Sequence, residues 1–291
     1  MNQDLILKYV QFCCDVRKRR LRTLKEYGYI LCKMDKCFDL IKAPDQAFVE
    51  RALIAAQKAG KWEDNYISKI SCILVSFYKW LLSERHIDYN PYPFSRFKRP
   101  TLKEPEFLSP DEFDLIVSNP LLTLQEITML YLFWDTGIRR LEAVSLDISD
   151  VYFEDKLIKI GDFNSKGGYS GRWIPFGDKS AWFLNQHIKW LKKHSNNNCL
   201  FINSEWNRLD DNSVSDMFKK IGLLKTPSKR PQRLHPHLLR HSLGSRLLDK
   251  NAPQFYVMRL LGHKSPTMTN HYVHWNKDQL KVNADKYAVF A

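Results

Sequence analysis

Five prolines interrupt the chain between residues 90 and 113, in the stretch NPYPFSRFKRPTLKEPEFLSPDEF. Proline fixes the backbone φ angle and lacks an amide donor, so neither a long helix nor a central strand can pass through this stretch. The parts on either side must therefore bury their own apolar residues, and 291 residues are enough for two domains of ordinary size. We predict one domain over residues 1–98 and a second over residues 107–275, joined by a linker over residues 99–106.

The overall composition is that of a folded chain without a membrane span. Hydrophobic residues make up 44% of the sequence and charged residues 26%, which is typical of globular rather than disordered proteins. No apolar run approaches the roughly 18 residues that a span needs. The N-terminus has Asp4 ahead of its apolar stretch and no small-residue cleavage site, so no signal peptide is predicted. We therefore expect a cytoplasmic protein.

The six cysteines indicate neither a disulfide framework nor a metal site. None of them forms a CxxC pair, and no histidine pair lies at zinc-finger spacing from them. In a chain without an export signal we expect them to be reduced and mostly buried. The sequence predicts no metal and no other cofactor.

The formal net charge is +13. Residues 1–103 contain 20 Lys and Arg against 11 Asp and Glu, whereas residues 104–291 contain 25 against 21. Such an excess predicts a polyanionic partner, with nucleic acid favoured over an anionic membrane surface; a basic surface without a partner is the alternative. The candidate phosphate-binding residues of the N-terminal part and the linker are Arg17, Lys18, Arg19, Arg20, Lys69, Lys79, Arg96, Lys98 and Arg99.

Apolar residues recur at helical spacing through most of the N-terminal part. They predict helices over residues 5–16, 23–41, 45–60 and 64–85, with Thr23 as the N-cap of the second. Glycine and strand-like alternation are scarce here. We expect a small bundle of four to five helices.

The second part combines helices with short strands. The predicted helices cover residues 109–119, 124–137, 180–194, 211–223, 236–251, 253–262 and 276–287. The first of them has Ser109 as N-cap, Pro110 at its first position and Glu112 two residues later. Between residues 139 and 176 the pattern changes to short alternating strands with a Gly-rich turn at 167–171. The predicted fold class is therefore mainly α, with a mixed α+β second domain that holds a small antiparallel sheet.

Two arginine motifs of the second part are suited to phosphate binding. Arg139 follows the helix end at Gly137, and Glu142 can hold its guanidinium in a fixed orientation, although a surface ion pair is the alternative. His237 and Arg240 share one face near a helix N-terminus, where free amides also favour phosphate, although a solvated basic face is the alternative. No third ligand for a metal accompanies the histidines of this helix.

Three further residues lie in polar surroundings that suit chemistry. Lys166 is at the tip of the Gly-rich turn, where it can reach a site and give up a proton; an exposed turn lysine is the alternative. His263 follows Gly262 at a helix end, and Tyr272 comes nine residues later in the polar sequence TMTNHYVH. A core tyrosine would normally be inside an apolar run.

These residues follow one another along the chain as Arg139 with Glu142, Lys166, His237 with Arg240, Gly262 with His263, and Tyr272. The series closely resembles the active site of the tyrosine recombinase (phage integrase) family. The phrases TGIRRLEAVSL, HPHLLRHSLGSRLL and LLGHKSPTMTNHY resemble its three signature boxes, and the N-terminal helices resemble its core-binding domain. The resemblance thus covers nearly the whole chain. Since no extra domain precedes the bundle, it is closest to the compact Xer-like members.

The resemblance implies site-specific DNA recombination through a covalent 3′-phosphotyrosine. Tyr272 would attack phosphorus and store the bond energy, so that a 5′-hydroxyl reseals the strand without ATP. Arg139 and Arg240 would bind the non-bridging oxygens and neutralise charge in the transition state, so that no metal is required.

The remaining site residues would assist this chemistry. Lys166 would protonate the leaving 5′-oxygen, His237 would be the acid/base partner of the tyrosine, and His263 would hydrogen-bond the phosphate. The hairpin departs from the family pattern, because it lacks a basic residue between Lys166 and Arg172. Arg172 is therefore expected to bind the DNA backbone or to support the strand, and Glu142 to support Arg139.

The resemblance also implies partners. Double-stranded DNA with an inverted-repeat core site would be bound in the nucleoid, and the C-terminal segment 276–291 would exchange between protomers of a tetramer that holds two sites. No membrane is involved, and an accessory protein is unknown. Two alternatives remain open: a catalytically silent DNA-binding protein on the same scaffold, and a type IB topoisomerase-like enzyme that relaxes DNA as a monomer.

Overall fold

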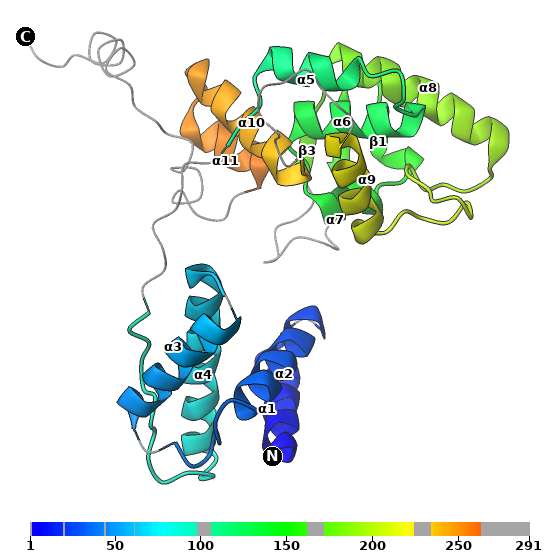
Figure 1. Cartoon of the computed structure of the whole chain (residues 1–291). Coiled ribbons are helices and arrows are strands. Elements are labelled where there is room, and N and C mark those ends of the chain that lie inside the picture. Colours follow the sequence, from blue (N-terminus) through cyan, green and yellow to red (C-terminus); the bar gives the residue numbers. More distant parts are fainter. Residues whose placement is uncertain are drawn as a thin grey trace, which may run out of the picture. The chain divides into compact units, whose positions relative to one another are not determined.

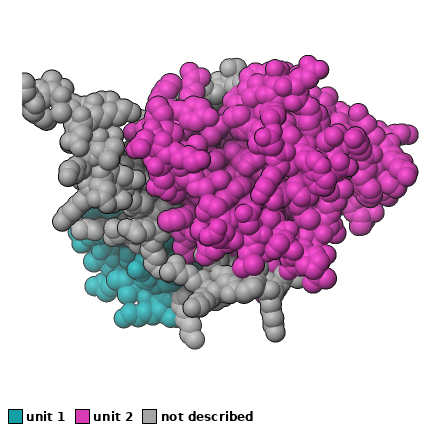
Figure 2. All heavy atoms as spheres, turned by 90° about the horizontal axis from the view of Figure 1, so that it is seen from above, with its two compact units in different colours: residues 1–103 teal, residues 104–291 magenta. Residues whose placement is uncertain are grey.

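The structure of the protein is a computed structural model. It describes residues 2–19, 21–43, 45–60, 62–97, 106–161, 172–223 and 234–262. The chain divides into two compact units, residues 1–103 and 104–291, which Figure 2 distinguishes by colour. Each unit has a hydrophobic core of its own.

The N-terminal unit is a helical bundle. Its helices are α1 (Gln3–Asp15), α2 (Leu21–Asp35), α3 (Gln46–Gly60) and α4 (Asp64–Ser83). α1 packs against α2, and both α2 and α3 pack against α4 (Figure 1). Tyr9 lies at the centre of the core, with its ring 5.2 Å from that of Phe77 and 5.4 Å from that of Trp80. The predicted helical bundle is confirmed.

The second helix differs from its predicted range. α2 contains Thr23 instead of starting after it, and it ends at Asp35 rather than at residue 41. Leu40 is fully buried, so the apolar pattern continues beyond the helix. Beyond the end of the helix, the Asp39 side chain accepts a hydrogen bond from the amide of Ile41, at 3.0 Å. Such a local bond competes with helical pairing.

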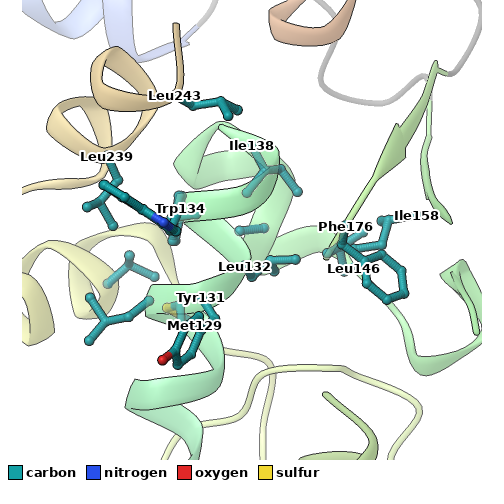
Figure 3. Packing of buried hydrophobic residues seen from close by; sticks show 14 of the residues in the cluster. Met129, Tyr131, Leu132, Trp134, Ile138, Leu146, Ile158, Phe176, Leu239 and Leu243 are labelled. Atoms are coloured by element: carbon teal, nitrogen blue, oxygen red, sulfur yellow. The ribbon is translucent and has the colours of Figure 1, made fainter. Parts of the chain in front are cut away.

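The C-terminal unit is built around one buried helix. Its helices are α5 (Pro110–Val117), α6 (Leu124–Thr136), α7 (Arg140–Ser145), the short 3₁₀ turn η1 (Ile148–Asp150), α8 (Asp178–His194), α9 (Asp211–Leu223), α10 (Pro236–Asp249) and α11 (Gln254–Leu261). α6 packs against α8 and against α10, and α10 lies beside α11 (Figure 1). Figure 3 shows Trp134 of α6 beside Leu239 of α10, with Ile158 and Phe176 on the opposite side of α6.

A three-stranded antiparallel sheet completes this unit. Its strands are β1 (Val151–Tyr152), β2 (Leu157–Ile160) and β3 (Arg172–Pro175), in the order β1-β2-β3. Ile158 is paired with Ile174, and both are fully buried. Ile160, the last residue of β2, is paired with Arg172, the first residue of β3. The predicted small sheet is confirmed.

The strands begin later than the alternating pattern predicts. Residues 140–145 form α7, and the first strand starts only at Val151. Arg208 explains the end of this helix, because its guanidinium donates to the carbonyls of Val144 and Leu146, each at 3.0 Å. A helix of this length depends on such contacts, since its own hydrogen bonds are too few to hold it.

Several helix ends agree with the sequence. Ser109 caps α5 with Glu112 in a reciprocal capping box, and Pro110 is at the start. Gly137 and Gly262 end α6 and α11 in the left-handed conformation, with φ values of 56° and 64°. Among the described helices, none combines the length and the apolar character that a bilayer crossing requires.

The cysteines differ from expectation in burial. All six are free thiols, but only Cys13 and Cys199 are buried. The prediction that most would be buried is wrong. Cys14, Cys37 and Cys72 are exposed at the surface of the N-terminal unit.

Candidate active site

Arg139 is placed by the end of α6 and the start of α7. Gly137 ends α6, and Arg139 is the N-cap residue of α7. A Cβ atom on Gly137 would lie 2.7 Å from Leu261 Cδ2 and 3.0 Å from Leu243 Cδ2. Glycine is therefore needed both for its positive φ and for the close approach of this turn to α10 and α11.

Glu142 holds two arginines. Its Oε2 accepts the backbone N–H of Arg139 at 2.8 Å, and its Oε1 accepts Arg139 Nη1 at 2.9 Å. Arg172, at the start of β3, donates from Nη1 to Oε1 at 2.8 Å and from Nη2 to Oε2 at 2.7 Å. The Glu142 side chain is only 1% exposed. The predicted bracing of Arg139 by Glu142 is present, and a second arginine shares the carboxylate.

The electrostatics of this cluster favour an ionised carboxylate. Burial alone would raise the pKa of Glu142, but the hydrogen bonds and charge of Arg172, together with Arg139, outweigh burial and lower the pKa to about 2. Glu142 is thus negatively charged at every physiological pH. Two guanidiniums and one carboxylate give the cluster a formal charge of +1.

Arg240 reaches the same region from α10. The residue is 4% exposed, and its Nη1 donates to the carbonyl of Gly137 at 2.6 Å. Its Nη2 donates to the carbonyl of Leu261, while Arg139 Nη2 donates to the next carbonyl, that of Gly262. Carbonyls at the C-terminal end of a helix lack intrahelical partners and carry partial negative charge. Two separate helices therefore bring their guanidiniums to the last residues of α11.

His237 is exposed near the N-terminal end of the same helix. Partial burial lowers the pKa of its imidazole below the ordinary value, and nearby positive charge lowers it further. The charges that add to this pKa shift, in decreasing order, are those of Arg240, His235, Arg140 and Arg139. The imidazole is therefore neutral at pH 7 and able to accept a proton. The positive charges of both predicted phosphate-binding arginines, Arg139 and Arg240, therefore act on the His237 imidazole.

The start of α10 has a contact that the sequence does not predict. His235 is the N-cap, and its ring Nδ1 accepts the amide of Leu238 at 3.0 Å. Pro236 occupies the first helical position. The predicted helix 236–251 starts at the same residue, in agreement with the preference of proline for that position, and only the histidine cap was not predicted. No group of three potential metal ligands occurs among the described residues.

The other predicted site residues divide into two groups. Arg172 was expected at the DNA backbone or supporting its strand, and in the structure both of its terminal nitrogens bind Glu142. Its bond partner is far away in sequence, so no local spacing could reveal the pair. The residues that lie outside the described part of the chain are Arg20, Lys98, Arg99, Lys166, His263, Tyr272 and the predicted helix 276–287.

The basic candidates of the N-terminal unit differ in their contacts. Arg17 lies over the rings of Phe12 and Tyr9, at 5.2 and 5.9 Å, and donates to Ser76. Two more have carboxylate partners: Lys69 pairs with Glu26, and Arg96 pairs with Glu50 at 3.6 Å. The three described candidates that remain are exposed and, like Arg17, have no ion pair with a described carboxylate: Lys18, Arg19 and Lys79.

Comparisons of sequence place these motifs in a known family. The chain matches the Phage integrase family over residues 106–279. It is 29% identical to tyrosine recombinase XerD of Oceanobacillus iheyensis over 233 residues, which are 76% of this chain and 75% of that protein. It is 30% identical to tyrosine recombinase XerC of Listeria welshimeri over 227 residues, 74% of this chain and 72% of that protein.

Solved structures of similar fold agree with this match. The Tn1549 transposon integrase in complex with circular intermediate DNA has a TM-score of 0.76 at 19% identity, covering 97% of this chain and 98% of that chain. A lambda integrase dimer bound to a COC′ core site has a TM-score of 0.72 at 21% identity, covering 94% and 79%. The predicted fold class is confirmed. The chain belongs to the phage integrase family and is a tyrosine recombinase, an enzyme that transfers DNA strands in site-specific recombination.

Proposed function

We propose that the protein has a phosphodiester-cleaving site to which six residues contribute. Arg139, Arg240 and His237 belong to the part of the chain that the structure describes, and Lys166, His263 and Tyr272 complete the site. The observation that carries this proposal is the convergence of Arg139 and Arg240 on two consecutive carbonyls, those of the last residue of α11 and of Gly262, which caps the helix. His263 is the next residue of the chain after this helix end.

The two arginines would supply the charge that a phosphodiester requires. A phosphate diester repels nucleophiles because it is anionic, and its transition state gathers more negative charge on the non-bridging oxygens. The planar guanidinium presents paired donors that fit two phosphate oxygens. Arg139 is suited to this role because its side chain is 35% exposed while Glu142 fixes its orientation. Arg240 is held more rigidly by two backbone carbonyls.

The remaining residues account for the bond and the two protons that move in the covalent step. The phenolic oxygen of Tyr272 forms a bond to phosphorus, and the bond from phosphorus to the 5′-oxygen breaks. His237 accepts the phenol proton, and Lys166 gives a proton to the departing 5′-oxygen. The neutral state of His237 supports its part, since only a neutral imidazole can accept a proton. Attack by a 5′-hydroxyl on the phosphotyrosine reverses the step and reseals DNA.

The partner and the assembly follow from the same family. The chain would bind double-stranded DNA with an inverted-repeat core site, with residues 1–98 as the core-binding domain and residues 99–106 as the linker to the catalytic domain 107–275. The segment 276–291 would join protomers into a tetramer on two sites in the nucleoid of the cytoplasm. The net charge of +13 and the DNA complexes of similar solved structures support a DNA partner.

A suicide substrate tests the proposal. A nicked duplex carrying a core site loses a short 5′ fragment on cleavage, so the protein–DNA adduct accumulates and migrates as a new band in a denaturing gel. We expect the adduct with the wild-type protein and none with Tyr272→Phe. An adduct that persists in Tyr272→Phe would refute the assignment of the nucleophile. Duplex binding with no adduct from the wild-type protein would instead indicate the catalytically silent alternative.

A further inference from the structure

We infer that Arg172 is a positioning residue, which balances the charge of Glu142 and thereby leaves the charge of Arg139 available to a DNA phosphate. This inference rests on the proposed role of Arg139 as a phosphate ligand. It assigns to Arg172 a contact inside the protein in place of a contact with DNA.

The geometry of the shared carboxylate supports this assignment. Arg172 binds both oxygens of Glu142, at 2.8 and 2.7 Å, whereas the Arg139 side chain binds one of them, at 2.9 Å. Bidentate pairing is the stronger of the two arrangements. The negative charge of Glu142 is therefore neutralised mainly by Arg172. The hydrogen bond from Glu142 still orients Arg139 but does not cancel its positive charge.

The charge of Arg172 decides whether the cluster around Glu142 is neutral or positive. Glu142 with Arg139 alone would have no net charge, and a neutral pair attracts a phosphate weakly. Adding Arg172 restores a net charge of +1. Because Glu142 is 1% exposed, solvent cannot screen its charge from Arg139, so a nearby cation must do so.

The position of Arg172 in the fold makes it suitable for this role. It opens β3 opposite Ile160, the last residue of β2, and Lys166 lies between these two strands in the sequence. A Cβ on Gly262 would lie 3.0 Å from Arg172 Cζ and 3.1 Å from Arg139 Nη1. Both guanidiniums thus pack closely against the same glycine, which limits how far either can turn.

A direct phosphate contact by Arg172 is the competing explanation. Against it, both terminal nitrogens of Arg172 are hydrogen-bonded to an ionised carboxylate. Those of Arg240 donate to backbone carbonyls, which carry only partial charge. To reach DNA, Arg172 would have to leave a buried carboxylate without its main partner.

A charge-swap experiment on the full chain separates these explanations. Single-turnover cleavage of the nicked duplex, and duplex binding over a range of salt, are measured for the wild-type protein, Arg172→Gln, Arg172→Lys and the double variant Glu142→Gln with Arg172→Gln. Thermal unfolding checks that each variant is folded. The wild-type adduct is the reference that tests the proposed function itself.

Charge balancing predicts a rescue. Arg172→Gln should slow cleavage by about tenfold or more, within the range of couplings in one salt-bridge network, while the loss of affinity should be small because binding is spread over many phosphates. The double variant removes the unbalanced carboxylate and should recover most of the lost rate. Arg172→Lys should remain nearer to wild type than Arg172→Gln, and it serves also if Arg172→Gln does not fold.

If the wild-type protein forms the adduct, three results would overturn the inference alone. A double variant that is folded and no faster than Arg172→Gln would exclude charge balancing. An affinity loss in Arg172→Gln that the double variant does not recover, with the slope of log affinity against log salt reduced by about 1 in both, would identify a direct phosphate contact. Normal cleavage by Arg172→Gln would remove any role. A wild-type protein without adduct would refute the proposed function and this inference together.

Discussion

Arg139 and Arg240 donate hydrogen bonds to two consecutive backbone carbonyls at the C-terminal end of α11. Two like-charged guanidiniums would repel each other if nothing lay between them, and these carbonyls carry partial negative charge. The helix end therefore holds both cations in one place before any phosphate arrives. Such preorganisation is what makes a charged site effective in a transition state, because the donors need no rearrangement during the reaction.

The first prediction concerns the buried arginine of this pair. Arg240→Ala should lower the cleavage rate by about 100-fold or more, while duplex binding stays within about tenfold, because binding is spread over many phosphates. Cleavage is followed with the nicked duplex and binding by fluorescence anisotropy. Arg259→Ala is the matched control, since Arg259 is an exposed arginine of α11 that lies over Phe255. Loss of all DNA binding in the Arg240 variant would point to a structural role.

The second prediction concerns the turn that presents Arg139. Gly137→Ala combines a positive φ with a Cβ 2.7 Å from Leu261 Cδ2, so it should destabilise the protein by about 1–3 kcal/mol. Gly161→Ala is the control, because a Cβ there would meet no atom within 4 Å. Urea unfolding measures both. Equal stability of the two variants would show that this turn relaxes without strain.

How much of this site could be predicted depends on the kind of contact. Gly137 and Gly262 were found because a glycine after an apolar run is typical of a helix C-terminus. Arg139 with Glu142 was found because a carboxylate three residues away in the sequence can reach the guanidinium within one turn of chain. The carbonyls that bind the guanidiniums could not be predicted, since every residue has one. Pairing of Arg172 with Glu142 depends on how β3 meets α7, which local spacing does not encode.

The fold shows the same division. The bundle, the small sheet and most helix boundaries follow from apolar periodicity and capping residues. The end of α2 was predicted too late because Leu40 is buried in a turn, and burial alone does not distinguish a turn from a helix. α7 was missed as a separate helix because Arg208 stabilises its end from a distant position.

The third prediction uses the acidity of Glu142. Its pKa is lowered from 4.5 to about 2, so ionised Glu142 stabilises the fold above pH 4.5, and this contribution is lost as the pH falls toward 2. The contribution is on the order of 3 kcal/mol. The unfolding free energy of Glu142→Gln, measured with urea between pH 5 and pH 2.5, should therefore decrease less on acidification than that of the wild type. The exposed substitution Glu205→Gln should retain the wild-type dependence, and identical slopes for all three proteins would refute the prediction.

The fourth prediction concerns the proton acceptor. Because the pKa of His237 lies below 6.5, the neutral imidazole persists into mildly acidic solution, and the acidic limb of the cleavage rate should have its midpoint below pH 6.5. Arg140 contributes to this pKa from its ion pair with Asp211, so Arg140→Gln removes a positive neighbour and should move the midpoint to higher pH. Arg259→Gln should leave it unchanged. His237→Gln should slow cleavage by about 100-fold or more and abolish the acidic limb. If that limb remains in His237→Gln, another group accepts the proton of the tyrosine.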